Sequence, residues 1–237
     1  MTYSPILAIV TAVFEVSAAI WVLRGPGRKA VLRTTAAILV FLAGYQIVEV
    51  GICSLAPGYG FLPRLAFMVV TWLPPLGILL VSFLLGSGAR GARRFAYGML
   101  ALALGIVVWI AFDTSFATLS VCNAVYARYD HPMPRFVAYS GFYWLGLLGL
   151  VGLSAYGAAR PRDAHDGELT KQLLTGSVAF LVPAVVTSKF VPAAEGALPS
   201  VMCHFAILLA AFLVRLVYLE RRGTEETETE EPSPAFR

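Results

Sequence analysis

Seven apolar stretches, each long enough to cross a lipid bilayer as a helix, fill this 237-residue chain from Ile6 to Leu219. A spanning helix needs about 20 mostly apolar residues. The stretches and their short connections use nearly the whole chain, so the sequence predicts an all-α polytopic membrane protein whose seven-helix bundle forms one domain over residues 1–222. We expect the spans at 5–23, 34–54, 65–86, 95–114, 136–157, 172–191 and 199–219.

The composition indicates that the lipid bilayer is the main partner of this chain. Hydrophobic residues make up 58% of it and charged residues 14%, which is more apolar surface than a water-soluble domain of this length can bury. The net charge of +4 does not favour nucleic-acid binding, because the basic residues lie at helix ends rather than on one face. No basic segment precedes the first stretch, so we expect no cleavable signal peptide.

Basic residues divide unevenly between the predicted loops. The first, third and fifth loops and the segment after the last span carry most of them, whereas the even-numbered loops carry few. The positive-inside rule therefore places the N-terminus outside and the C-terminus in the cytoplasm. Residues 223–237 are acidic and poor in apolar side chains, and we expect them to form a disordered cytoplasmic tail.

Prolines and glycines shape the expected bundle. Pro74 and Pro75 lie near the middle of the third span, where they remove two backbone donors and should kink or open the helix. Such a kink can help to form a cavity. In the fifth span, Gly146, Gly149 and Gly152 recur every three residues, a pattern typical of close helix packing.

Few ionisable side chains lie within the spans, where each costs about 2.5–3.5 kcal/mol on insertion scales unless it is paired or faces water. Glu49 shares one helix face with Gln46, and His204 shares one face with Ser200 and Cys203. With the predicted topology, Glu49 and His204 lie at the same depth, about five residues below the outer surface. We therefore expect a polar cluster in the outer half of the bundle, built around Glu49, Gln46 and His204.

Other candidate site residues lie near this predicted cluster. Tyr45 neighbours Gln46 in the chain, Trp72 precedes the two prolines, and Asp113 lies slightly closer to the outer surface. Glu15 in the first span lies deeper than Glu49, and we expect it to matter less.

The cluster is compatible with three interpretations. It could be a hydrogen-bonded pair that fixes helix register, a small-molecule or proton pocket open to the outside, or a metal site. The metal site would use His204 and Glu49 with Asp113 or Cys203, and these ligand types suit zinc. However, the spans contain no pair of histidines at ligand spacing.

Cysteine positions suggest a covalent link on the outer side. Cys53, Cys122 and Cys203 all fall at or near the external side, where an oxidising compartment permits disulfides. A bridge between Cys53 and Cys122 would hold the fourth loop, at about 115–134, over the second span as a lid. The alternatives are free apolar thiols and an unstructured loop.

Gly44-Tyr45-Gln46-Ile47-Val48-Glu49 resembles the Gln-x-x-Glu signature in the second helix of an uncharacterised family of bacterial seven-helix membrane proteins. The start Tyr3-Ser4-Pro5 and the stretch from Leu198 to Ala206 are similar to the family's other two landmarks. The family often has a second Gln or an aromatic residue where this chain has Tyr45 or His204. The resemblance implies a multi-pass protein of the bacterial inner membrane and brings no established activity.

No phosphate loop, nucleophile elbow or dinucleotide fingerprint is present, and the sequence identifies no cofactor. We expect a membrane protein that binds a small molecule, lipid or ion in an outward-facing polar pocket, in a sensory or accessory role. It would act alone or as a subunit of a membrane complex. The alternatives are a metal-dependent intramembrane hydrolase that uses His204, Glu49 and Asp113, and a small transporter or proton-coupled carrier.

Overall fold

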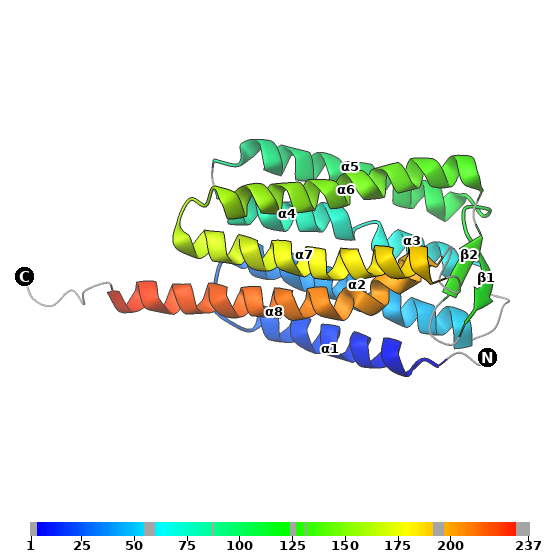
Figure 1. Ribbon diagram of the computed structural model, residues 1–237, viewed down its shortest axis with the longest axis horizontal. Coiled ribbons are helices and arrows are strands. Elements are labelled where there is room, and N and C mark those ends of the chain that lie inside the picture. The colour runs from blue at the N-terminus through cyan, green and yellow to red at the C-terminus, as the bar shows by residue number, and fades with distance from the viewer. Residues whose placement is uncertain are drawn as a thin grey trace, which may run out of the picture.

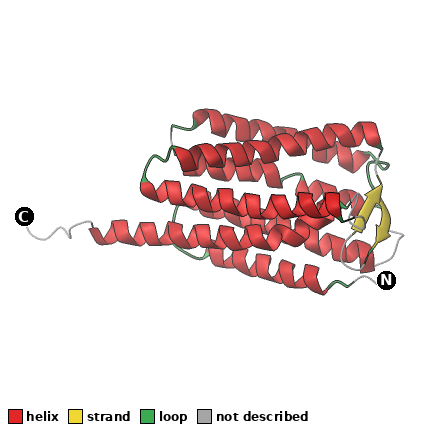
Figure 2. Ribbon diagram, in the orientation of Figure 1, coloured by secondary structure: helices red, strands yellow, loops and turns green. Residues whose placement is uncertain are grey.

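The computed structural model describes residues 4–54, 60–86, 88–123, 127–130, 132–191 and 197–230, without the side chains of 120 and 225–230. Helices lie side by side in an elongated bundle, and a small β-hairpin crosses one end (Figures 1 and 2). The elements, in chain order, are α1 (Ile6–Leu23), α2 (Lys29–Ser54), α3 (Leu62–Val70), α4 (Leu73–Leu84), α5 (Arg90–Phe112), β1 (Thr118–Cys122), β2 (Ala127–Asp130), α6 (Met133–Ala159), α7 (Ala164–Phe190) and α8 (Leu198–Glu230).

The described residues contain seven helices long and apolar enough to cross a membrane, with α3 and α4 counted as one interrupted span. This confirms the predicted all-α, seven-helix architecture. The predicted spans are shorter than the helices at several ends, because polar residues continue the helices beyond their apolar parts. α2 begins at Lys29 and α7 at Ala164.

The C-terminal helix also differs from the sequence prediction. α8 continues to Glu230, so residues 223–230, which we expected to be disordered, are helical. The Thr224 hydroxyl donates to the Glu220 carbonyl at 3.0 Å within this extension. Residues 231–237 of the predicted tail lie outside the described residues.

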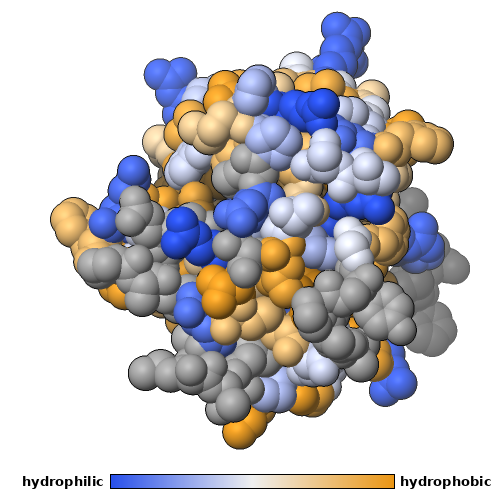
Figure 3. Space-filling model, turned by 90° about the vertical axis from the view of Figure 1, so that its right-hand side faces the viewer, coloured by the Kyte–Doolittle hydropathy of each residue, from blue (hydrophilic) through white to orange (hydrophobic). Residues whose placement is uncertain are grey.

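The two ends of the bundle are built differently (Figure 1). One end, called here the hairpin end, carries β1 and β2. The two strands pair antiparallel, with Thr118 opposite Asp130 and Cys122 opposite Ala127. Figure 3 looks onto this end, where hydrophilic and hydrophobic residues are interspersed. At the opposite end, called here the Arg28 end, the turn between α1 and α2 meets the start of α7 and the C-terminal part of α8.

The paired prolines open the third span, as predicted. α3 ends at Val70 and α4 begins at Leu73. Pro74 and Pro75 lie in the first turn of α4, where a missing N–H costs no helical hydrogen bond. The N–H and hydroxyl of Thr71 both donate to the Phe67 carbonyl, at 3.0 and 2.6 Å, which keeps the turn before the break hydrogen-bonded.

The glycines of α6 allow close packing inside the bundle. A Cβ atom on Gly146 would lie 2.5 Å from Cβ of Pro74, and one on Gly149 would lie 2.8 Å from the Phe95 ring. A Cβ atom on Gly152 would meet nothing within 4 Å. The first two glycines therefore seat α6 against α4 and α5.

Candidate functional site

A polar cluster lies between α1, α2 and α8, in the half of the bundle nearer the hairpin. Glu15 of α1 and Glu49 of α2 are both 0% exposed, and Gln46 of α2 is 1% exposed. Ser200 and Cys203, in the first turns of α8, are buried beside them. Three helices that are distant in sequence thus bring these polar groups into one region that has almost no access to solvent.

Gln46 provides the direct link between α2 and α8. Its Nε2–H donates to the backbone carbonyl of Cys203 at 2.5 Å. The Oε1 atom of the same amide is buried and has no hydrogen-bond partner. The link fixes the position of α8 relative to α2 at this level of the bundle.

Glu49 and His204 come close together, as the sequence pattern predicts. The Glu49 carboxyl group lies near the hydroxyls of Ser200 and Tyr45 and the ring of His204. Neither carboxyl oxygen has a hydrogen bond of good geometry. The His204 Nδ1 atom lies 2.8 Å from the Ser200 carbonyl, and because a carbonyl only accepts, Nδ1 carries the proton. The Nε2 atom of a neutral His204 is then an acceptor.

Glu15 belongs to the same region, although we expected it to lie deeper and matter less. Both of its carboxyl oxygens are buried without a partner. The Cys203 thiol lies within electrostatic range of both Glu15 and Glu49. Two carboxyl groups without partners in an apolar bundle are costly in their ionised form.

The β-hairpin covers this cluster. The N–H of Ala127 donates to the Ser200 hydroxyl at 3.2 Å, and the hydroxyls of Tyr45 and Tyr129 lie 3.4 Å apart. A disulfide joins Cys53 at the end of α2 to Cys122 of β1, with a Cα–Cα distance of 5.8 Å. This is the pairing put forward from the sequence, and the fourth loop is an ordered lid where it is described.

Beside the cluster lies a cavity of about 200 Å³, called here the aromatic cavity. Cys203 and Met202 of α8 form part of its wall, so it adjoins the polar cluster without containing Glu49. Tyr139 and Tyr143, one turn apart on α6, stack with ring centroids 6.0 Å apart. The lining residues are Leu42, Val70, Leu73, Phe136, Tyr139, Ser140, Tyr143, Trp144, Leu147, Phe180, Leu198, Pro199, Met202 and Cys203.

The α6 residues of this cavity were not among the site residues predicted from the sequence. The sequence signal for this cavity is an aromatic residue at each of positions 136, 139 and 143 in the fifth span. This spacing places all three on one helix face. The two flanks of the α3–α4 break, Val70 and Leu73, also line it. The proline break thus borders a cavity, as the sequence suggested.

Asp113 and Trp72 lie apart from the polar cluster. Asp113 follows α5 and accepts hydrogen bonds from Nη1 of Arg135 at 2.8 and 2.9 Å and from the N–H and hydroxyl of Ser115. The Ser115 hydroxyl, with a smaller contribution from Arg135, holds the pKa of the Asp113 carboxyl below its usual value. Trp72 stacks on Phe41, with ring centroids 6.2 Å apart.

The geometry gives little support to the predicted metal site. Among the described residues, no three His, Cys, Asp or Glu side chains come close enough together to hold a metal ion. Asp113, which with Cys203 was one of the two expected further ligands beside His204 and Glu49, forms an ion pair with Arg135 instead.

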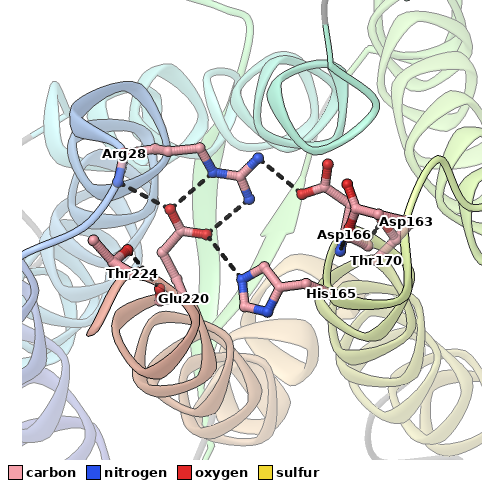
Figure 4. A network of polar contacts seen from close by, with 7 residues as sticks. All are labelled: Arg28, Asp163, His165, Asp166, Thr170, Glu220 and Thr224. Atoms are coloured by element: carbon pink, nitrogen blue, oxygen red, sulfur yellow. Dashed lines mark hydrogen bonds and ion pairs between the residues drawn. The ribbon is translucent and has the colours of Figure 1, made fainter. Parts of the chain in front are cut away.

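A second polar network lies at the Arg28 end (Figure 4). The N–H and Nε of Arg28 donate to Oε1 of Glu220 at 2.9 and 2.8 Å, and its Nη2 donates to Oε2 at 2.7 Å. Its Nη1 lies 2.8 Å from Asp166 of α7, and Nε2 of His165 lies 3.8 Å from Glu220. The hydrogen bonds to Glu220 raise the pKa of the Arg28 guanidinium above its usual value.

This network was not predicted from the sequence, because Arg28 and Glu220 are 192 residues apart and no local spacing connects them.

The chain matches none of the protein-family models compared with it, and no curated protein is similar to it in sequence.

Proposed function

We propose that this chain is an integral membrane protein that binds a small, mainly apolar molecule with one or two polar groups in the aromatic cavity. The observation that carries this proposal is the cavity itself, about 200 Å³ in volume, between the α3–α4 break, α6 and α8. Ligand sites are typically apolar recesses with a few polar groups that set orientation. The hydroxyls of Tyr143 and Ser140 and the indole of Trp144 can supply those groups.

The ligand site proposed here lies beside the polar pocket expected from the sequence. Glu49 and Gln46 are buried and do not line the aromatic cavity, and Gln46 lines a separate recess between α1 and α2. Instead, Gln46 holds the Cys203 backbone, and Cys203 lies in the cavity wall. The polar cluster therefore positions α8 against the bound molecule, a geometry suited to a sensory or accessory role.

We also propose that the hairpin end faces the outside and that the C-terminus lies in the cytoplasm of a multi-pass membrane protein. The basic residues of the odd-numbered loops support this orientation. The Cys53–Cys122 disulfide at the hairpin end supports it independently, since an oxidising compartment maintains such bonds.

Filling the cavity tests the binding proposal. Ser140 lines the cavity, whereas Ala138 on the same helix is exposed on the outer surface of the bundle. We expect the purified protein to retain a co-purifying apolar compound, detected by solvent extraction and mass spectrometry. Ser140→Phe should lose that compound, and the matched control Ala138→Phe should keep it, while both variants melt cooperatively. Retention by a folded Ser140→Phe protein would refute this site.

A further inference from the structure

A second cavity, of about 190 Å³, lies at the Arg28 end. It is formed where the turn between α4 and α5 faces the turn between α6 and α7. It shares no lining residue with the aromatic cavity. Leu84 and Leu85 give it an apolar side, and Arg160 and Arg162 give it a cationic side. This combination matches a site at the boundary between lipid and water.

The cavity has an excess of positive charge. Neither Arg160 nor Arg162 forms an ion pair with an acidic side chain within the described ranges. Asp166 also lies in the wall, but Nη1 of Arg28 lies 2.8 Å from its carboxylate and neutralises it. Asp163 caps the start of α7 by accepting the N–H of Asp166 at 2.7 Å. The two arginines of the wall therefore remain available to an anion.

Backbone features place these arginines and add further donors. Gly86 has φ +78°, and a Cβ atom there would lie 3.0 Å from Nη1 of Arg162, so glycine lets the guanidinium lie against this turn. The Arg160 guanidinium lies 6.0 Å from the centre of the Tyr156 ring. α5 begins after Ala89 without a side-chain cap, and Ala89 lines the cavity. The first turn of α5 follows Ala89 directly, so the positive end of its helix dipole lies next to the cavity.

We propose that this cavity binds a phosphate group, held by Arg160, Arg162 and the first-turn amides of α5. Guanidinium groups recognise phosphate through paired hydrogen bonds, and a free helix start favours the same charge. Leu84 and Leu85 would contact the apolar part of the molecule that carries the phosphate. The phosphate belongs either to the headgroup of an anionic phospholipid or to a small soluble phosphate.

Lipid titration of the purified full-length chain tests the proposal. Binding of phosphatidylglycerol and of phosphatidylcholine is followed by native mass spectrometry. Replacing both arginines, Arg160→Gln with Arg162→Gln, should weaken phosphatidylglycerol binding about thirtyfold, since each arginine of the cavity wall would contribute about 1 kcal/mol through its hydrogen bonds to the phosphate. The control pair, Arg33→Gln with Arg222→Gln, removes the same charge from the same end outside the cavity and should leave the affinity nearly unchanged. Equal weakening by both pairs would overturn the proposal.

Wild-type protein provides a second measurement that does not depend on the variants folding. Phosphatidylglycerol should raise its melting temperature more than phosphatidylcholine does. Inorganic phosphate that competes with the lipid and raises the melting temperature by itself would identify a soluble phosphate as the ligand. Lipid binding that excess inorganic phosphate leaves intact would identify a headgroup. No preference for phosphatidylglycerol together with no response to phosphate would refute the site.

Discussion

Glu49 and Glu220 are both buried acidic side chains, 0% and 2% exposed, but they lie in opposite halves of the bundle and in opposite surroundings. Glu220 accepts three hydrogen bonds from Arg28 and lies near His165. Glu49 has polar neighbours, yet no hydrogen bond of good geometry reaches either of its oxygens. The two side chains are therefore equally buried, but only Glu220 has hydrogen-bond partners that compensate its charge.

This difference indicates that Glu220 stabilises the fold, whereas burying Glu49 costs free energy. At the Arg28 end, a single arginine joins the α1–α2 turn to α7 and α8, and the network closes the bundle where α8 leaves it. Near the hairpin, Glu15 and Glu49 make no hydrogen bond of good geometry, and both lie close to Cys203 of the cavity wall. Groups that destabilise a fold are concentrated at functional sites. We infer that the network around Glu220 holds the fold and that the cluster around Glu49 serves the proposed ligand of the aromatic cavity.

The largest effect should come from Glu220→Gln. The change keeps the shape of the side chain but places an amide donor against the guanidinium of Arg28. Removing one partner of a buried ion pair typically destabilises a protein by about 3–5 kcal/mol. Because Glu220 is buried but the Arg28 side chain is 40% exposed, we expect a loss at the lower end, about 3 kcal/mol. Equilibrium unfolding in mixed micelles of SDS and a mild detergent measures it. A loss no larger than that of an exposed ion pair would refute the structural role of this network.

The next largest effect concerns the covalent link at the hairpin end. The Cys53–Cys122 disulfide has a sequence separation of 69 residues. Removing it with Cys53→Ser and Cys122→Ser should cost about 2 kcal/mol, at the low end of the usual range, because spanning helices already restrict the unfolded chain. The matched control is Cys203→Ser, which removes the free cysteine. Thermal melting with and without reductant measures the effect, and a wild-type protein that reductant leaves unchanged would contradict it.

The third prediction also replaces a buried Glu by Gln, but the expected change in stability has the opposite sign to that of Glu220→Gln. Glu49→Gln replaces a buried carboxyl group by a neutral amide, which costs less to bury than an ionised carboxylate does. The hydroxyls of Ser200 and Tyr45 lie close enough to pair with the amide. We expect a gain in stability of about 1 kcal/mol at neutral pH, measured by the same unfolding assay. A loss matching that of Glu220→Gln would mean that the two acids are equivalent, and the comparison would fail.

The helices and part of the candidate site could be predicted from sequence patterns, for identifiable physical reasons. Long apolar stretches gave the number of spans, and adjacent prolines gave the break before α4. The spacing of Gln46 and Glu49, together with the matched depth of His204, brought the right helices together because helical rise and periodicity fix both quantities. These features depend only on local geometry.

What the sequence could not provide depends on contacts between distant elements. Arg28 finds Glu220 only when α8 folds back along α1 and α2, and Arg162 reaches its cavity only beside the left-handed turn at Gly86. Asp113 looked like a ligand from its depth alone. The ion pair with Arg135 forms because α5 ends and α6 begins at the hairpin end of the bundle. No spacing within one span reveals this.

The smallest effect should come from Asp113, whose side chain is 14% exposed, unlike the two buried acids. The Ser115 hydroxyl and Arg135 lower its pKa below the ordinary value of 3.8. A carboxyl group whose pKa is lowered by folding stabilises the protein while it is ionised, and this contribution disappears as the pH falls through the folded pKa. Asp113→Asn should therefore lower the melting temperature slightly at pH 7, with a difference that shrinks below about pH 4. Arg135→Gln should behave alike, and the double variant should add little, since both changes remove one ion pair. A melting difference that persists unchanged in acid, or that grows there, would show that Asp113 acts through contacts other than its charge.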